Sequence, residues 1–324
     1  MIPIRDTVPS KNFPIINNLL IGINVVMFAV QLMQGSDIGF QRFIYYHGLV
    51  PARYTVPGWA DDVTAFQMGL ALVSFMFLHG GFLHLLGNMW SLYIFGDNVE
   101  DRLGPLRYSA FYLLSGLISG LTHLALNAQS TAPTIGASGA VAGVMGAYFL
   151  LHPSAKILTL IPIIIIPWFV EIPAFFFLGI WFLIQLINAS QSFGAASGIA
   201  WWAHIGGFVC GMLLLKLFGA LPSAGFTANL QKATARKKSH RFQMVRPGLK
   251  TGDADVFGSI AISPYEALVG TRKLVNIPHG FQRRMLRVNV PPGIEAGKVL
   301  RLRGQGNEKP DGNRGDLLLK VMVQ

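Results

Sequence analysis

The chain has 324 residues, of which 52% are hydrophobic and only 13% are charged, about half the charged fraction of an average soluble protein. Its net charge of +11 lies entirely in residues 220–324, because residues 1–219 contain eight basic and eight acidic side chains. These figures exclude a single water-soluble domain. They predict an apolar part of roughly 220 residues, followed by a basic, soluble part of roughly 70 to 100.

The composition and the first apolar run disfavour three further features. Basic charge can indicate nucleic-acid binding, but a cytoplasmic segment beside an anionic membrane leaflet explains it more simply, so we expect no nucleic-acid partner. The single cysteine, Cys210, excludes a disulfide framework and a thiolate metal cluster. The first apolar run has no clear small-residue cleavage site, so we expect an anchor and not a cleaved signal peptide.

The apolar part contains six runs that are long enough, or nearly long enough, to cross a bilayer. The segment between the first and second runs, 35–68, is too mixed to span and is expected at the surface, partly helical. The fold class predicted for the apolar part is an all-α polytopic membrane protein with six transmembrane helices. The expected spans lie near 15–34, 80–97, 106–126, 137–151, 165–188 and 201–219.

The positive charges in the short loops predict the orientation of these spans. With the N-terminus inside, only Arg42 and Arg53 lie on the outer side, and the remaining basic residues of the loops and the tail lie on the cytoplasmic side. The reverse orientation would place nearly every positive charge on the wrong face. We therefore expect both the N-terminus and the C-terminal part in the cytoplasm.

The sequence changes character after the last span. Residues 220–253 are small, polar and basic, which is typical of a linker. Residues 254–324 contain short β-like runs, among them "VFGSIAIS", "TRKLVNI" and "DLLLKVMV", separated by turn sequences such as "PPGIEAG". The predicted domains are thus a helical membrane domain at 1–219, a basic linker at 220–253 and a small β-rich domain at 254–324.

Polar residues gather at one level of the predicted spans. Even-numbered spans run from outside to inside, and His84, Asn88, Ser138 and His204 all fall in the first third of such a span. His84 and Asn88 are four residues apart and share a helix face. The fourth span is roughly 6 Å shorter than the hydrocarbon core, which would place Ser138 in a recess below the outer surface.

These residues permit acyl transfer. A serine hydroxyl becomes a nucleophile when a base takes its proton, and His204 is the well-placed base. The backbone N–H of Ser138 and the side chains of His84 and Asn88 could stabilise the oxyanion. Because Glu171 is expected at the inner end of the fifth span, no carboxylate lies at this level, and the arrangement would be a Ser–His dyad.

Structural explanations of the same residues remain open at this point. Gly139 and Gly143 belong to a small-residue pattern that usually indicates close helix packing, and Gly207 and Gly211 repeat it on the sixth span. The glycines could serve both purposes, because close packing would bring Ser138 within reach of His204. His84 and Asn88 could instead bond across helices, and we assign structural roles to His79 and His123.

Three motifs resemble the rhomboid family of intramembrane serine proteases. "GASGAVAGVMGAY" resembles the family's nucleophile motif, with Gly136 and Ser138 in the expected positions, and "AHIGGFVCG" resembles its histidine helix, with His204. "HGGFLHLLGNMW" resembles its second span, so that His84 and Asn88 match oxyanion residues and His79 matches a structural histidine. The likeness covers about residues 12–219, although the family's Trp-Arg pair in the first loop is absent.

The resemblance implies an activity and its requirements. A rhomboid-like bundle would hydrolyse peptide bonds in or beside transmembrane segments of substrate proteins within the bilayer, with water and without a metal or other cofactor. The family's mobile cap corresponds to "NASQSFGAASGIA", whose glycines and serines suit a flexible lid. We expect an integral protein of a prokaryotic inner membrane whose active site opens to the outer face.

The tail resembles a second family. "ISPYEALVGTRKLVNIP" and "VNVPPGIEAGKVLRLRGQG" are similar to the C-terminal substrate-binding β domain of DnaJ-type chaperones. The resemblance implies a module that binds a peptide or protein ligand, or a folded appendage that stabilises or spaces the enzyme. No His-Pro-Asp tripeptide occurs, so stimulation of a chaperone ATPase is not supported.

The main alternative to a protease is a non-catalytic protein of the same fold that binds transmembrane helices as an adaptor or chaperone. Such proteins typically lack the serine or the histidine, and this chain has both. A transporter would require paired charges at the midplane or broken helices in two similar halves, and neither pattern is present in the sequence.

Overall fold

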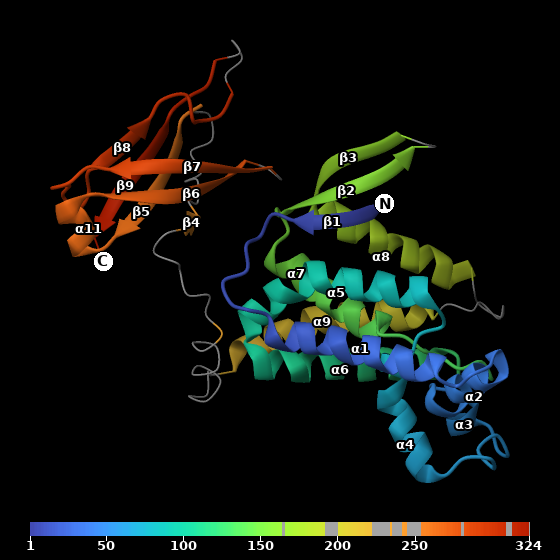
Figure 1. Cartoon of the computed structure of the whole chain (residues 1–324). Helices are drawn as coiled ribbons and strands as arrows, with labels where there is room; N and C mark the ends of the chain where they lie inside the picture. Colours follow the sequence, from blue (N-terminus) through green and yellow to red (C-terminus); the bar gives the residue numbers. More distant parts are fainter. Residues whose placement is uncertain are drawn as a thin grey trace. The chain divides into compact units, whose positions relative to one another are not determined.

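The computed structural model describes residues 1–163, 166–191, 200–221, 234, 242–244, 254–279, 282–308 and 313–323. The chain divides into two compact units, Met1–Arg236 and Lys237–Gln324 (Figure 1). The first has a helical core and the second is rich in β-structure, as predicted. The domain boundaries at 219 and 254 stay predictions, since most of the expected linker lies outside the described residues.

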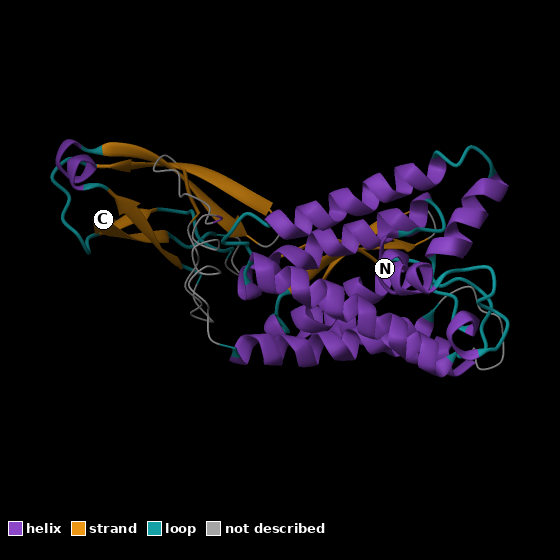
Figure 2. Cartoon of the chain, turned by 90° about the horizontal axis from the view of Figure 1, so that it is seen from below, coloured by secondary structure: helices purple, strands orange, loops and turns teal. Residues whose placement is uncertain are grey.

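The first unit is organised around α7 (Ser138–Leu151), in which every residue from Gly139 to Tyr148 is buried. Helix α7 packs against α9 (Trp201–Ala220), α6 (Pro105–Leu126) and α5 (Phe82–Leu103). Figure 2 shows these helices lying side by side. The unit is completed by α1 (Ile15–Leu32), α2 (Asp37–His47), α3 (Ala52–Thr55), α4 (Ala65–Ser74), the short 3-10 helix η1 (Phe75–Phe77) and α8 (Ala174–Gln191).

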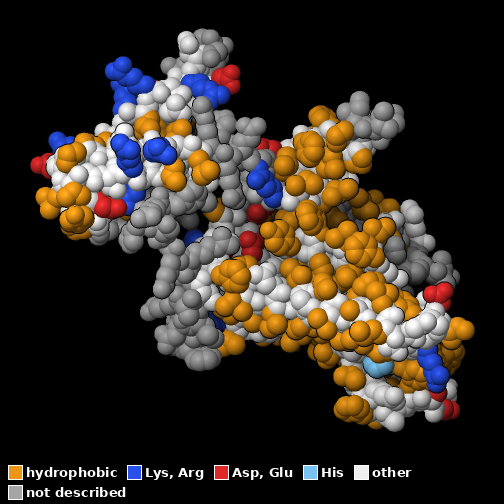
Figure 3. All heavy atoms as spheres, viewed as in Figure 1, with side chains coloured by type: hydrophobic (Ala, Val, Ile, Leu, Met, Phe, Trp, Pro, Cys, Tyr) orange, Lys and Arg blue, Asp and Glu red, His pale blue; other side chains and the backbone are white. Residues whose placement is uncertain are grey.

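Helix α1 shows the reversed polarity of a helix that faces lipid. Its buried positions include Asn17, Asn24 and Gln31, one every seven residues, and its exposed positions include Leu19, Ile23 and Val26. Lipid solvates apolar side chains, whereas polar side chains need partners inside the protein. Figure 3 shows hydrophobic side chains spread over the visible face of this unit. These are the features of a membrane-embedded bundle.

The expected number of six spans is not confirmed. Four described helices, α1, α6, α8 and α9, are long and apolar enough to cross a membrane, and a fifth span results if the bent pair formed by Ala65–Phe77 and Phe82–Leu103 counts as one. The two halves of that pair meet at 75°. Helix α7 has 14 residues and is classed as a shorter apolar helix.

The fifth span was predicted near 165–188, and this start lies too early in the chain. The structure instead has a hairpin of β2 (Lys156–Ile163) and β3 (Ile166–Pro173), paired antiparallel, and α8 begins only at Ala174. Pro162, Pro167 and Pro173 interrupt this stretch, and its many β-branched residues favour a strand over a helix. A third strand, β1 (Ile2–Asp6), pairs with β2 and was also not predicted.

Glu171 therefore does not lie at the end of a helix as expected. It belongs to β3, where its carboxylate bonds Lys156 Nζ of the neighbouring strand at 2.8 Å. The pair links the two strands at the base of the hairpin.

The acidic end of α5 caps the start of α1. No side chain of α1's own N-cap, Pro14, bonds its first turn. Glu100 instead accepts hydrogen bonds from the backbone N–H groups of Ile16 (3.1 Å) and Asn17 (2.8 Å), and Asp101 accepts one from Asn12 (2.8 Å). A carboxylate at a helix N-terminus satisfies free N–H groups and complements the helix dipole. The motif "FGDNVEDRLG" thus joins the first two long helices.

Asp6, at the end of β1, is held by two helices of the bundle. Its Oδ2 atom accepts hydrogen bonds from Tyr148 of α7 at 2.5 Å and from Asn98 of α5 at 3.0 Å. Burial raises the pKa of Asp6 to about 6, against the hydrogen bond from Tyr148, which lowers it. The folded protein therefore holds this proton more tightly than the unfolded chain does.

Replacing Asp6 should remove a pH dependence of stability. Since the folded pKa lies above the ordinary value, this carboxyl favours the folded state most at low pH, and its contribution falls as pH rises from about 4 to about 6. Over that pH range, the free energy of unfolding of the wild type should fall by up to about 3 kcal/mol relative to that of Asp6→Asn. Thermal unfolding in detergent at several pH values measures this. The exposed-site variant Asp61→Asn should follow the wild type, and an Asp6→Asn curve parallel to the wild type would contradict the assignment.

The second unit contains two three-stranded sheets. In one, β4 (Phe242–Met244) pairs parallel to β6 (Thr271–His279), which pairs antiparallel to β7 (Gln282–Val290). In the other, β5 (Val256–Ile262) pairs parallel to β9 (Leu317–Val323), which pairs antiparallel to β8 (Val299–Leu302). Their shared core includes Val256, Ile260, Val275, Val288, Leu317, Leu319 and Val321.

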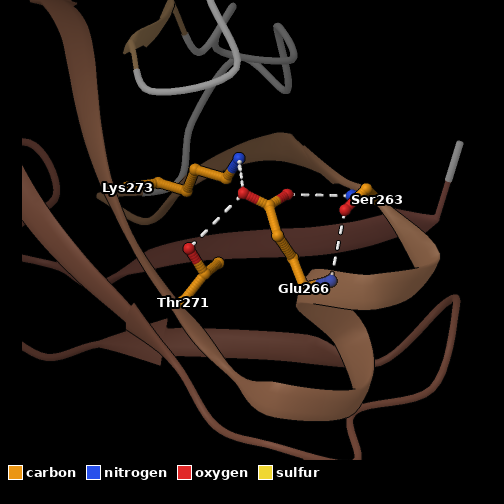
Figure 4. A network of polar contacts seen from close by, with 4 residues as sticks. All are labelled: Ser263, Glu266, Thr271 and Lys273. Carbon is orange, nitrogen blue, oxygen red and sulfur yellow. Dashed lines mark hydrogen bonds and ion pairs between the residues drawn. The ribbon is translucent and has the colours of Figure 1, made fainter.

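A short helix, α11 (Pro264–Val269), carries the main buried polar contact of this unit (Figure 4). Glu266 and Ser263 form a capping box, with the Glu266 N–H donating to Ser263 Oγ at 3.1 Å and the Ser263 N–H donating to Glu266 Oε2 at 2.9 Å. The other carboxylate oxygen bonds the ammonium of Lys273, whose side chain is only 1% exposed, at 2.5 Å. The buried charge thus has a partner on the neighbouring helix.

The variant Glu266→Gln should destabilise the second unit. It leaves the buried Lys273 ammonium beside a neutral amide in place of a carboxylate, and the loss of a hydrogen bond to a charged group typically costs about 1.5–3 kcal/mol. Hydrogen exchange of the β6 and β7 amides in the full chain should show correspondingly lower protection. Glu295→Gln, at an exposed position, is the matched control, and equal protection in the two variants would refute the expectation.

Candidate active site

Ser138 is the first residue of α7, and the turn that precedes it requires glycine. Gly136 has a φ of +127°, a value that other residues rarely adopt. A Cβ atom at Gly136 would lie 2.8 Å from the ring of His84 and 3.5 Å from Ser138 Oγ. The backbone therefore passes close to both side chains, which only a glycine permits. His84 and Ser138 consequently border the same small space.

Ser138 and His204 come together from different helices. Nε2 of His204, near the start of α9, lies 2.8 Å from Ser138 Oγ at the start of α7. This distance is that of a hydrogen bond between a hydroxyl and an imidazole nitrogen. A serine in this position can pass its proton to the histidine as it attacks a carbonyl carbon.

Glycines allow the two helices to approach this closely. A Cβ atom at Gly207 would lie 2.1 Å from the carbonyl oxygen of Gly139, and one at Gly211 would lie 2.0 Å from that of Gly143. The backbones of α7 and α9 are therefore in direct contact over at least two turns. The packing explanation and the catalytic explanation of the small residues describe one arrangement.

The two residues expected at the oxyanion lie on α5. His84 accepts a hydrogen bond from the backbone N–H of Gly80 through Nδ1 at 3.3 Å, which leaves its Nε2 atom facing Gly136. Asn88 follows one turn later on the same face and is 7% exposed. Within the described part of the chain, its Nδ2 donor group has no hydrogen-bond acceptor. A buried donor without a partner is rare.

His79 lies beside this group and is completely buried. Its backbone N–H and C=O bond the side-chain amide of Gln31 on α1 at 2.9 and 3.0 Å, and its ring packs edge to face on His84, with centroids 5.1 Å apart. These contacts fit the supporting role predicted for it. They fix the bend between η1 and α5.

Gln185 was missed from the sequence. It lies on α8, is 4% exposed, and its Oε1 atom is 2.8 Å from His204 Nδ1. The same helix contributes Trp181, whose ring centroid lies 6.0 Å from that of His204. Gln185 is neither ionisable nor part of a motif. Only its polarity within the apolar run "GIWFLIQLI" could have indicated its importance from the sequence.

The predicted lid, "NASQSFGAASGIA", covers 188–200, and residues 192–199 lie outside the described residues. Across the described ranges, no group of three or more His, Cys, Asp or Glu side chains is placed to hold a metal ion.

Two parts of the chain match known domain families. Residues 67–220 match the rhomboid domain. Residues 241–324 match the DnaJ C terminal domain, so the β-rich second unit has a family as well. Both resemblances predicted from the sequence are thereby confirmed.

Several proteins named as rhomboids are similar to part of this chain. RHOMBOID-like protein 5 of Arabidopsis thaliana is 32% identical over 164 residues, 48% of this chain and 46% of the relative. A candidate rhomboid protease of Bacillus subtilis, YdcA, is 32% identical over 124 residues, 35% of this chain and 59% of the relative. Rhomboid protein 1, mitochondrial, of Saccharomyces cerevisiae is 28% identical over 204 residues, 60% and 50% of the two chains.

The chain thus spans about half the length of these relatives. Other relatives of this chain are named as mitochondrial or chloroplastic proteins, so the expected prokaryotic inner membrane is not confirmed. They do agree with the membrane-embedded helices of the first unit.

The variant Gly207→Ala should separate α9 from α7. The added methyl group would overlap the Gly139 carbonyl, and overpacking of this kind typically costs about 1–3 kcal/mol. We expect a lower unfolding temperature in detergent, while Gly219→Ala, on the same helix with open space around it, should behave like the wild type. Equal unfolding temperatures for the two variants would show that the contact between the helices is not close in solution.

Proposed function

We propose that this protein is an intramembrane serine endopeptidase that hydrolyses peptide bonds in or next to the transmembrane segments of other proteins. The observation that carries the proposal is the 2.8 Å contact between Ser138 Oγ and His204 Nε2, made between two helices of a rhomboid domain. The membrane-embedded bundle around this pair supports a substrate that arrives from the bilayer.

In the proposed reaction, Ser138 Oγ attacks the scissile carbonyl carbon while His204 Nε2 takes the hydroxyl proton. The tetrahedral intermediate collapses as the imidazolium returns this proton to the leaving amine. The acyl-enzyme is then hydrolysed by water, activated by the same nitrogen, and the serine is regenerated. No step requires a cofactor.

The oxyanion would be stabilised by three donors. The Ser138 N–H lies in the first turn of α7, where backbone N–H groups have no partner within the helix. The Nδ2 group of Asn88, which has no acceptor among the described residues, is a second donor, and His84, next to Gly136, is a third. A buried donor kept free of protein acceptors is what an oxyanion site requires.

The topology is part of the proposal. We propose that α7 also crosses most of the membrane, which gives six crossings, with Ser138 recessed below the outer face and both ends of the chain in the cytoplasm. Helical substrates resist hydrolysis because their backbone is fully hydrogen-bonded, so the substrate would unwind locally at this depth. The cleavage site would lie near the outer end of its transmembrane segment.

The DnaJ C terminal domain would add a cytoplasmic peptide-binding module. We keep the predicted organisation, with a membrane domain at 1–219, a linker at 220–253 and the β domain at 254–324. This domain is also the observation that favours the alternative function, an adaptor that binds transmembrane helices without cleaving them.

One experiment separates the two functions. Wild type, Ser138→Ala and Ser109→Ala are reconstituted in liposomes with a transmembrane substrate and probed in parallel with a serine-reactive fluorophosphonate. Ser109 is a partly exposed serine on α6 whose hydroxyl bonds the Leu106 carbonyl. A protease predicts cleavage and labelling in the wild type and Ser109→Ala, and a loss of both by at least about a thousandfold in Ser138→Ala.

If the wild type shows no cleavage and no labelling, the protease function is overturned and the adaptor is favoured. Labelling without cleavage would keep the nucleophile and reject the substrate chosen.

A further inference from the structure

The imidazole of His204 is bonded on both of its nitrogens. Nε2 lies 2.8 Å from Ser138 Oγ and Nδ1 lies 2.8 Å from Gln185 Oε1. Because Gln185 is 4% exposed and the His204 ring bonds residues of both α7 and α8, bulk water does not replace the second contact. The histidine is therefore held by a neutral side chain on the side where many serine hydrolases place a carboxylate.

A second hydrogen bond decides how the Gln185 amide is oriented. Its Nε2 group donates to the backbone carbonyl of Trp181, one turn earlier on α8, at 3.1 Å. A flipped amide would place its oxygen against that carbonyl oxygen, where neither group can donate. The helix therefore directs Oε1, which can only accept, toward His204.

We infer that Gln185 is a positioning residue that fixes the tautomer of His204. Since Oε1 only accepts, Nδ1 must carry the proton, and Nε2 is left bare to accept the proton of the Ser138 hydroxyl. When Nε2 takes that proton during attack, the Nδ1–H bond to Gln185 becomes charge-assisted and strengthens. Gln185 thus acts through the histidine and has no contact with the reacting atoms.

This inference rests on the proposed function, but it has a readout that is independent of activity. In protein labelled with ¹⁵N-histidine, solid-state NMR distinguishes a protonated from an unprotonated ring nitrogen, and loss of one signal in His204→Asn assigns it. The wild type should show one tautomer of His204, protonated on Nδ1, and Gln185→Leu should show a mixture. A wild-type signal from the opposite tautomer would overturn the inference even if the enzyme cleaves.

The kinetic test compares Gln185→Leu with Gln185→Glu. The leucine removes the acceptor and should lower kcat by roughly 10- to 100-fold with KM nearly unchanged. Glutamate restores an acceptor and adds a negative charge beside the ring, so activity should recover and the acidic limb of the pH profile should move to higher pH. The titratable side chains that act on His204 in the native site are His84 on α5 and His123 on α6, and neither is changed.

Gln34→Leu is the matched control, because Gln34 makes the same bond to the carbonyl four residues earlier but is exposed. Wild-type kcat in Gln185→Leu would overturn the inference, as would equal losses in the leucine and glutamate variants with no movement of the pH profile. If Gln185→Leu does not fold, the pH profile of Gln185→Glu decides. Absence of Ser138-dependent cleavage in the wild type would instead reject the proposed function, and the NMR result would stand separately.

Discussion

The direct contact between the backbones of α7 and α9 is the constraint on which the candidate site depends. Gly139 and Gly207 leave no room for a methyl group between the two helices. At this separation, side chains at the start of both helices meet across a single hydrogen bond, and Ser138 reaches His204. Helices held apart by larger side chains pack at 8–10 Å, where a serine would be too short. The glycines thus determine how closely the serine and the histidine approach each other.

The lipid environment explains why the remaining polar groups lie where they do. Asn17, for example, donates to the carbonyl of Leu92 at 3.1 Å and accepts from Tyr108 at 2.7 Å, which joins α1, α5 and α6. Gln31 makes a comparable pair of bonds to the backbone of His79. In water such contacts would add little, but in a bilayer a polar side chain has few other partners. These contacts hold α1 against the helix that carries His84 and Asn88.

Some features of the structure follow local sequence patterns and others do not. Ser138, His204 and the β-runs of the tail could be identified because each follows a local pattern: a motif, a level within a span, or alternation between turns. The hairpin at 156–173 could not be identified in this way. Its isoleucines are as typical of a membrane span as of a strand, and only its prolines distinguish the two. The supporting contact of Gln185 depends on how α8 packs on α9, which no local pattern specifies.

A neutral partner for His204 is also what the surroundings favour. An ionised carboxylate at this depth would have to be removed from water, and its interaction with the His204 ring offsets only part of that energy cost. An amide accepts the Nδ1 proton at the same distance without a buried charge, and its own helix satisfies its second polar group through Trp181. The low-dielectric surroundings of the site therefore explain why no Asp or Glu completes a triad at this level of the spans. The Gln185 amide orients His204 as a carboxylate would, but it places no negative charge beside the ring.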